Sequence, residues 1–335
     1  MPAHSRDIAA INWQALVDEA LRRRKAEGMT QREHAALAGV SVPTMAGFER
    51  AETTLTLAKV FDILRVVGLV EEAPQAGAQE RFVREAFERW RTLTETLPDD
   101  SPARFRDGWY RFDYCLEGDL KTVSLTAFET VLKRAQLKLT GWPVFMTETR
   151  PEIAPREVDG TIECWLGAEA GRENLAFNDP AHFDFWRAAP TGRLFLIRGH
   201  QEDSQETFPA GSILDTTLPV WRMGETLLHA ARLASLLRAD DNTAITIRFR
   251  ALYSGLTGRV LKSWANPLSD LVIEGHGARS DEAMLEVEAP ADALKDNLAA
   301  FVFPLVSSLF ERFGVTGLSV KRVETEVDRL LKSRI

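Results

Sequence analysis

The chain has 335 residues, of which 45% are hydrophobic and 27% charged. This composition is that of a folded globular protein and excludes a disordered, collagen-like or disulfide-stapled chain. The length exceeds that of one small module and predicts two or three domains. The first thirty residues contain no continuous apolar run of the kind found in a secretory signal, so we expect a cytoplasmic protein.

Membrane spans and metal sites are also not expected. The most apolar stretch, Asn297 to Phe310, is too short to cross a bilayer and contains Pro304, so it predicts a buried helix. Cys115 and Cys164 stand far apart with no CxxC partner, which argues against a zinc site and fits a reducing compartment. We therefore expect no membrane association, no metal and no cofactor.

The net charge of −8 is unevenly distributed. Residues 1–70 hold nine Lys and Arg against eight Asp and Glu, whereas residues 71–335 hold 32 against 41. An acidic body repels nucleic acid, so any DNA contact is expected in the N-terminal part, where Arg22 to Lys25 form a basic run.

Four short helices are predicted in the N-terminal part, over residues 13–26, 31–38, 41–50 and 56–67. Thr30 is an N-cap with Glu33 at the capping-box distance, and Ser41 is the N-cap of the third helix. Pro43 falls in the first turn of that helix, where proline is tolerated. Two short helices joined by a glycine-containing turn are a helix-turn-helix motif.

The residues of this motif carry a resemblance to a known family. They are Met29-Thr30-Gln31-Arg32-Glu33, Ala38-Gly39-Val40-Ser41, Thr44-Met45 and Phe48-Glu49-Arg50. Over about residues 12–69 the chain resembles the Xre/Cro-CI, or phage-repressor, type of helix-turn-helix transcription regulator. The resemblance implies that Gln31 contacts phosphate and supports the recognition helix, while Met45 and Phe48 pack that helix onto the core.

The same resemblance implies a set of DNA-binding residues. Those on the third helix would lie on its exposed face against base edges, and Arg32 and Arg50 are expected to contact the DNA backbone. The set is Thr30, Gln31, Arg32, Ser41, Val42, Pro43, Thr44, Gly47 and Arg50.

Two positions depart from the family pattern. His34 stands where leucine is usual, and we interpret it as a histidine of the core rather than a pH sensor. The recognition helix has no Arg, Asn or Gln at its base-reading positions, although these types make the bidentate contacts to guanine and adenine. Thr44 and Val42 could still contact thymine methyl groups, with specificity modest or dependent on DNA shape. A small helical domain that no longer binds DNA remains an alternative.

Residues 71–140 are predicted to be a linker followed by a helical region. Residues 71–79 have the Pro, Ala and Gly content of a linker. An apolar helical stripe follows from Phe82 to Leu97, which would form either core or a dimer seam, and a second helix is expected over 124–139.

Residues 141–335 are predicted to form an α+β domain for sensing or oligomerisation. Strands are expected at 161–166, 193–198, 212–217, 243–253, 258–264 and 283–287, and helices at 219–237, 292–313 and 323–332. The strands are expected to be antiparallel, with a hairpin through residues 252–258. The predicted fold is thus an all-α N-terminal helix-turn-helix domain (1–70) followed by a larger α+β C-terminal domain.

No catalytic motif stands out in the α+β domain, so no catalytic residue is assigned and no enzyme is expected. Glu225 and His229 share a helix face, and we interpret the pair as structural. Three residues could line a pocket for an acidic or phosphorylated ligand. Arg198 and His200 follow a strand, and Arg222 opens the next long helix. A solvated turn beside a charged helix start is the alternative.

The sequence therefore predicts a cytoplasmic, homodimeric regulator that binds double-stranded operator DNA and is expected to be a repressor. Its C-terminal domain is expected to form the dimer or to respond to a small-molecule or protein effector. Two alternatives remain: an enzyme or defence effector with an autoregulatory helix-turn-helix module, and a large antitoxin-type autorepressor.

Overall fold

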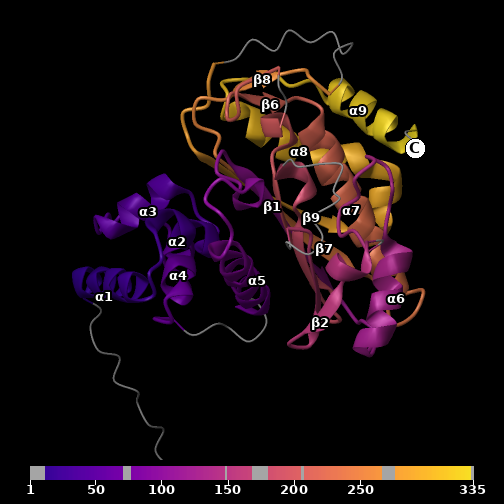
Figure 1. Cartoon of the computed structure of the whole chain (residues 1–335), viewed down its shortest axis with the longest axis horizontal. Coiled ribbons are helices and arrows are strands. Elements are labelled where there is room, and N and C mark those ends of the chain that lie inside the picture. Colours follow the sequence, from indigo (N-terminus) through magenta and orange to yellow (C-terminus); the bar gives the residue numbers. More distant parts are fainter. Residues whose placement is uncertain are drawn as a thin grey trace, which may run out of the picture. The chain divides into compact units, whose positions relative to one another are not determined.

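The computed structural model describes residues 12–70, 77–147, 149–167, 180–204, 207–265 and 276–332. The chain divides into two compact units, Met1–Glu80 and Arg81–Ile335. Figure 1 shows short helices in the first unit and helices packed on a sheet in the second. The predicted all-α N-terminal domain and larger α+β domain are confirmed.

The N-terminal unit contains α1 (Trp13–Ala26), α2 (Gln31–Ala38), α3 (Val42–Glu49) and α4 (Leu57–Val66). Its core combines Val17 of α1, Met45 and Phe48 of α3, and Ile63 of α4, all essentially inaccessible to solvent. Trp13 packs edge-on against Phe48, with ring centroids 5.6 Å apart. The predicted packing role of Met45 and Phe48 is thus confirmed.

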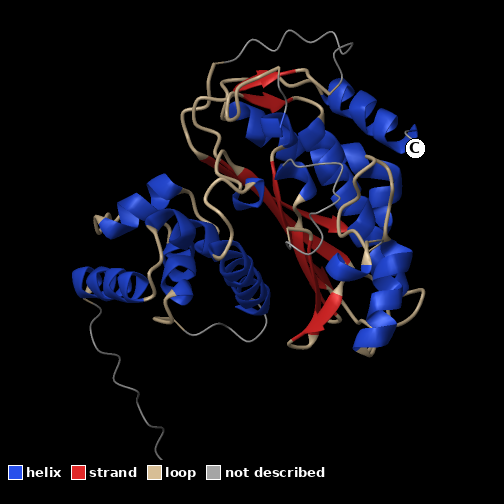
Figure 2. Cartoon of the chain, in the orientation of Figure 1, coloured by secondary structure: helices blue, strands red, loops and turns tan. Residues whose placement is uncertain are grey.

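The C-terminal unit is built on a seven-stranded sheet in which every pair of neighbours is antiparallel. The strands follow the order β2 (Arg156–Val158), β3 (Thr161–Trp165), β4 (Phe185–Ala189), β5 (Arg193–Gly199), β1 (Trp109–Glu117), β7 (Thr246–Ser254) and β9 (Glu282–Pro290). A separate parallel pair joins β6 (Ile213–Asp215) to β8 (Val260–Lys262). Figure 2 shows the long strands crossing the centre of this unit.

The main helices of this unit are α5 (Gly77–Glu95), α6 (Leu125–Ala135), α7 (Leu218–Leu237), α8 (Leu294–Glu311) and α9 (Val320–Lys332). Alternate residues of β1, among them Phe112 and Tyr114, share a core with α6, α7 and α8. Within it Met223 and Leu227 of α7 are fully buried, because a long helix lying on a sheet must bury its inward stripe.

One segment, Ala291–Glu311, is long and apolar enough to cross a membrane by length and composition. In the structure it packs against α7, α9 and β9. Its residues Leu298, Val302 and Leu309 lie in the core with at most 2% of their surface exposed. This packing supports the buried helix predicted there.

Three expectations for the C-terminal part need correction. The region 71–140 is not only helical, because it contributes β1, which lies between β5 and β7 in the sheet. The boundary expected at residue 140 consequently falls inside one compact unit. The expected 252–258 hairpin is absent, since β7 pairs with β1 and β9 while β8 pairs with β6. The sequence also did not indicate β4.

The apolar stripe of α5 belongs to the core rather than to an exposed dimer seam. Phe87 and Trp90 contact Trp109 at the start of β1, with centroids 5.6 and 6.3 Å apart. Trp90 also stacks on Phe105, just after the short 3-10 turn η1 (Pro102–Arg104). Of the linker predicted before this helix, residues 71–76 lie outside the described residues and the rest begin α5.

Candidate functional site

The turn between α2 and α3 is fixed by local hydrogen bonds. The Thr30 hydroxyl accepts the N–H of Glu33 while the Glu33 carboxylate accepts the N–H of Thr30 at 2.8 Å, so the predicted capping box is present. Gly39 ends α2 with φ of +67°, a conformation that favours glycine. Ser41 then caps α3 by accepting the N–H of Thr44. These bonds fix the residues at which α2 begins and ends and the residue at which α3 begins.

A polar network ties α3 to the other helices of the unit. Gln31 donates its side-chain N–H to Glu49 at 2.7 Å, and the other Glu49 oxygen lies 3.0 Å from an Arg24 nitrogen. Arg24 also donates to the carbonyl of Met29 at 2.9 Å. The supporting role expected of Gln31 therefore has a structural basis, with Glu49 as its partner.

The exposed face of α3 is smaller than the sequence indicated. Pro43 and Arg50 are exposed, whereas Ser41, Val42 and Thr44 are half-buried. Gly47, expected to face base edges, is buried, and a Cβ built on it would lie 2.8 Å from a Glu52 carboxylate oxygen. The Glu52 side chain thus covers Gly47, which corrects its assignment as an exposed DNA-reading residue.

The basic groups of this unit are largely engaged within it. Arg50 donates to Glu52 at 2.7 Å, and this pair is exposed. In the basic run, Arg22 and Arg23 both pair with Glu19 at 2.7–2.8 Å. These two arginines hold the pKa of Glu19 down at about 2. Thr30 and Arg32, at the start of α2, are exposed. Exposed ion pairs contribute little to stability, so their cations can exchange partners.

His34 is a buried core residue, as interpreted from the sequence. Only 2% of its surface is exposed, and its Nε2 donates to the carbonyl of Ile63 at 3.0 Å. Burial lowers the pKa of His34 below its ordinary value, because a desolvated imidazolium is unfavourable. The folded unit therefore holds His34 neutral near pH 7.

Acid is expected to loosen the N-terminal unit through His34. The unfolded chain takes up a proton near pH 6.5 while the folded one resists it, so stability is full above that pH and falls as the pH drops toward the lower folded pKa. From pH 7 to pH 5, hydrogen exchange of the α2 and α4 amides should slow less than the intrinsic, base-catalysed rate slows, because the folded unit opens more often as its stability falls. In His34→Leu this difference should disappear; an equal difference in both proteins would rule out His34 as its source.

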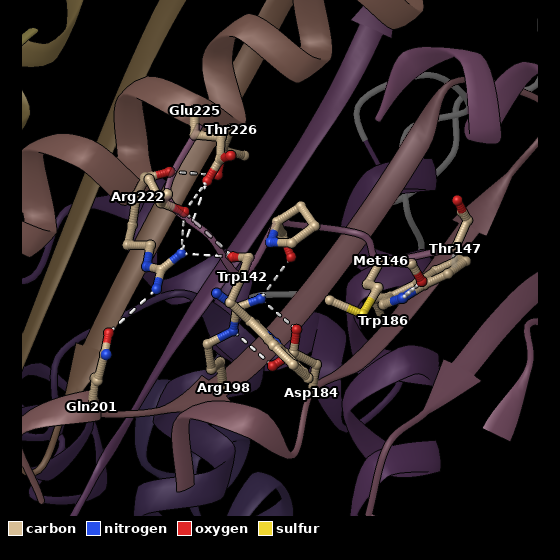
Figure 3. A network of polar contacts seen from close by, with 12 residues as sticks. Trp142, Met146, Thr147, Asp184, Trp186, Arg198, Gln201, Arg222, Glu225 and Thr226 are labelled. Carbon is tan, nitrogen blue, oxygen red and sulfur yellow. Dashed lines mark hydrogen bonds and ion pairs between the residues drawn. The ribbon is translucent and has the colours of Figure 1, made fainter. Parts of the chain in front are cut away.

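In the C-terminal unit, Arg198 lies near the end of β5 with no exposed surface. It donates to Asp184 through two nitrogens, from Nε at 2.6 Å, and to the carbonyl of Pro143 at 3.0 Å. Figure 3 shows this pair beside Arg222. Burial by itself would lower the pKa of Arg198, but the Asp184 carboxylate raises it above the ordinary value. Arg198 is thus a permanently charged, internally paired residue.

Arg222, in α7, makes a second internal network (Figure 3). It donates to the carbonyl of Trp142 at 2.7 Å, to the side-chain oxygen of Gln201 at 3.3 Å, and to the Thr140 hydroxyl. Thr140 in turn donates to a Glu225 oxygen at 2.6 Å. Arg222 therefore fastens the loop that follows α6 to the start of α7.

The third predicted ligand residue, His200, is also buried. Its Nε2 donates to the carbonyl of Ser254 at 2.9 Å, and burial lowers its pKa to about 4. His200 and Arg222 border a cavity of about 20 Å³. A space of that size holds one water molecule and no effector.

The start of α7 already holds an anion of the chain itself. One oxygen of Asp215 accepts the N–H groups of Thr217 and Leu218, each at 2.7 Å. The other accepts those of Trp264 and Ala265 at 2.7 and 2.8 Å. The anion-binding pocket predicted from Arg198, His200 and Arg222 is therefore corrected, because Asp184 and Asp215 supply the negative charges there.

Glu225 and His229 also have internal partners. The Nδ1 of His229 lies 2.9 Å from the Tyr114 hydroxyl, and its ring stacks on Phe145. Burial lowers the pKa of His229 to about 3. Within the described ranges, no group of three or more His, Cys, Asp or Glu side chains is placed to hold a metal ion.

Comparison with known proteins identifies one part of the chain. The model of the Helix-turn-helix family matches residues 21–73, which include α2, the turn and α3. No curated protein and no solved structure matches the chain. The family match thus coincides with the segment in which the structure places the capped two-helix motif.

Proposed function

The N-terminal unit carries a helix-turn-helix domain of the Xre/Cro-CI type, and from this premise we propose that the chain is a cytoplasmic, homodimeric repressor that binds specific operator DNA. The observation that carries the proposal is the motif itself, with a matched family and a capped α3 whose first turn bears the exposed Pro43. In helix-turn-helix proteins this turn of the second helix meets base edges in the major groove. We propose no enzymatic activity.

The surface around α3 supports recognition by shape and apolar contact. Pro43 is exposed and Val42 and Thr44 are half-exposed, so methyl and ring groups can approach thymine methyls. Arg32 and Arg50 are exposed cations and suit phosphate contacts. Phosphate contacts would supply a large part of the binding free energy of such an interface, so its affinity for DNA should fall steeply as the salt concentration rises.

Two-fold symmetry is proposed because operators of this class are palindromic. Leu57 and Phe61 of α4 stand one helical turn apart, with 66% and 37% of their surfaces exposed. Exposed apolar groups at this spacing form a small association surface. The α+β unit would strengthen the dimer and sense an effector.

The proposal is tested by selecting genomic fragments with the purified full chain and sequencing those retained. We expect a palindromic sequence to be enriched, light scattering to show two chains on one fragment, and a reporter behind that fragment to be repressed. Retention without any enriched sequence would contradict specific recognition, and a reporter activated by the chain would contradict repression.

Glu52→Gln is expected to raise operator affinity about threefold to tenfold, or ~0.7–1.4 kcal/mol. The change removes the negative charge that pairs with Arg50 while keeping the size of the side chain, and so frees a cation for phosphate. Operator titrations at several salt concentrations provide the measurement. Glu311→Gln, an exposed position on α8, is the control for net charge and should leave affinity unchanged. Equal affinities for all three proteins would place Arg50 away from the DNA backbone.

A further inference from the structure

The C-terminal unit contains a cavity of about 480 Å³ that neither the family match nor the sequence assigns. This volume lies within the range of small-molecule sites. Its described lining residues come from the segment after α6, the loop around η2 (Pro151–Ile153), the end of β3 and η4 (Pro180–His182). They are Gln136, Lys138, Gly141, Trp142, Pro143, Met146, Thr149, Arg150, Ile153, Leu166 and His182.

The wall formed by residues 139–147 is held in place by bonds to its backbone. Glu225 accepts the N–H of Leu139 at 3.0 Å, Arg222 binds the carbonyl of Trp142, and Arg198 binds that of Pro143. Further along, the Trp186 ring N–H donates to the carbonyl of Met146 at 3.0 Å (Figure 3). The buried arginines thus shape this cavity without lining it themselves, and a rigid wall reduces the entropy lost on binding.

The lining combines an apolar floor with a cationic rim. Ile153 and Leu166 are buried, while Lys138 and Arg150 are exposed at the mouth. Trp142 and His182, which both line the cavity, meet edge to face with ring centroids 4.3 Å apart and add aromatic surface to its wall. A ligand with an apolar ring body and one anionic group matches this division, because its charge can stay hydrated at the rim.

We propose that this cavity binds a small organic anion with a flat apolar body, such as an aryl carboxylate. Its identification as the effector site rests on the function proposed above, but binding itself does not. The ring system occupies the floor beside Trp142, and the carboxylate lies at the mouth between Lys138 and Arg150.

The test uses the full chain and two probes of nearly equal shape, 1-naphthylacetate and its neutral analogue 1-naphthylacetamide, in calorimetric titrations without DNA. We expect the acid to bind at least tenfold more tightly than the amide. The double variant Lys138→Gln/Arg150→Gln should lose this preference while keeping binding of the amide. The matched control Lys133→Gln/Arg134→Gln, on exposed positions of α6 that do not line the cavity, should keep it.

A second variant tests the apolar floor. Met146→Trp fills the cavity from a wall whose backbone is already fixed, and should abolish binding of both probes. Equal affinities for acid and amide, an unchanged preference in the Lys138/Arg150 variant, or no binding of either probe at millimolar concentration would overturn the proposal. Because no DNA is present, these outcomes are independent of whether the operator experiment succeeds.

Discussion

Replacing Pro43 by glutamate is expected to reduce operator affinity at least thirtyfold, about 2 kcal/mol, without unfolding the N-terminal unit. Pro43 is exposed in the first turn of α3, the part of the helix proposed to enter the major groove. A carboxylate there meets the field of the phosphates on both strands. The same carboxylate suits a helix N-terminus, where it interacts favourably with the macrodipole.

Pro43→Gln separates charge from shape in this experiment, because glutamine has the size of glutamate and no charge. We expect it to lose much less affinity than Pro43→Glu, and the difference should shrink as salt screens the repulsion. Fluorescence anisotropy with the selected operator, beside thermal melts of each variant, gives both quantities. Normal operator binding by Pro43→Glu would show that α3 is not the recognition helix.

The N-terminal unit could be predicted from sequence because its signals are local. The capping box of Thr30 and Glu33, the Ser41 cap and the left-handed Gly39 each act within a few residues. The prediction that failed there was the exposure of Gly47, because the side chain of Glu52, which lies beyond the end of α3, covers it. Helical spacing alone places Gly47 on the outward face and says nothing of a side chain folding back over it.

Strand β1 was missed although its period of two is present. Tyr110, Phe112 and Tyr114 face the core, but Arg111 and Asp113 alternate with them and are also buried, with at most 1% exposed. Charged residues are rarely placed inside proteins unless paired, so a sequence with both signs suggests a surface segment. Their ion pair, and that of Asp113 with Arg250 on the neighbouring strand, exist only once the sheet has formed.

The candidate ligand site was misplaced for a similar reason. The sequence shows that Arg198 lies at the end of a strand and Arg222 at the start of a helix. It does not show that the side chain of Asp184 reaches Arg198 or that the side chain of Thr140 reaches Arg222. The cavity of about 480 Å³ draws its walls from four separate segments, so no local pattern could indicate it. Contacts between residues far apart in the sequence determine both the pairing of these arginines and the position of the cavity.

Asp184→Ala is expected to destabilise the C-terminal unit by about 3–5 kcal/mol, because it leaves the fully buried Arg198 charge without its partner. Urea unfolding followed by tryptophan fluorescence measures this, since seven of the eight tryptophans lie beyond residue 80. Asp328→Ala, which removes an exposed ion pair with Lys332, should cost less than ~1 kcal/mol.

The double variant Asp184→Ala/Arg198→Met distinguishes an unpaired charge from a simple cavity. If the isolated cation causes the loss, removing it as well should restore much of the stability, since apolar replacement of both members of a buried pair is often neutral. If lost packing is the cause, the double variant should be at least as unstable as Asp184→Ala. A stable Asp184→Ala chain would instead mean that Arg198 finds another anion, and would return it to the candidate ligand-binding residues.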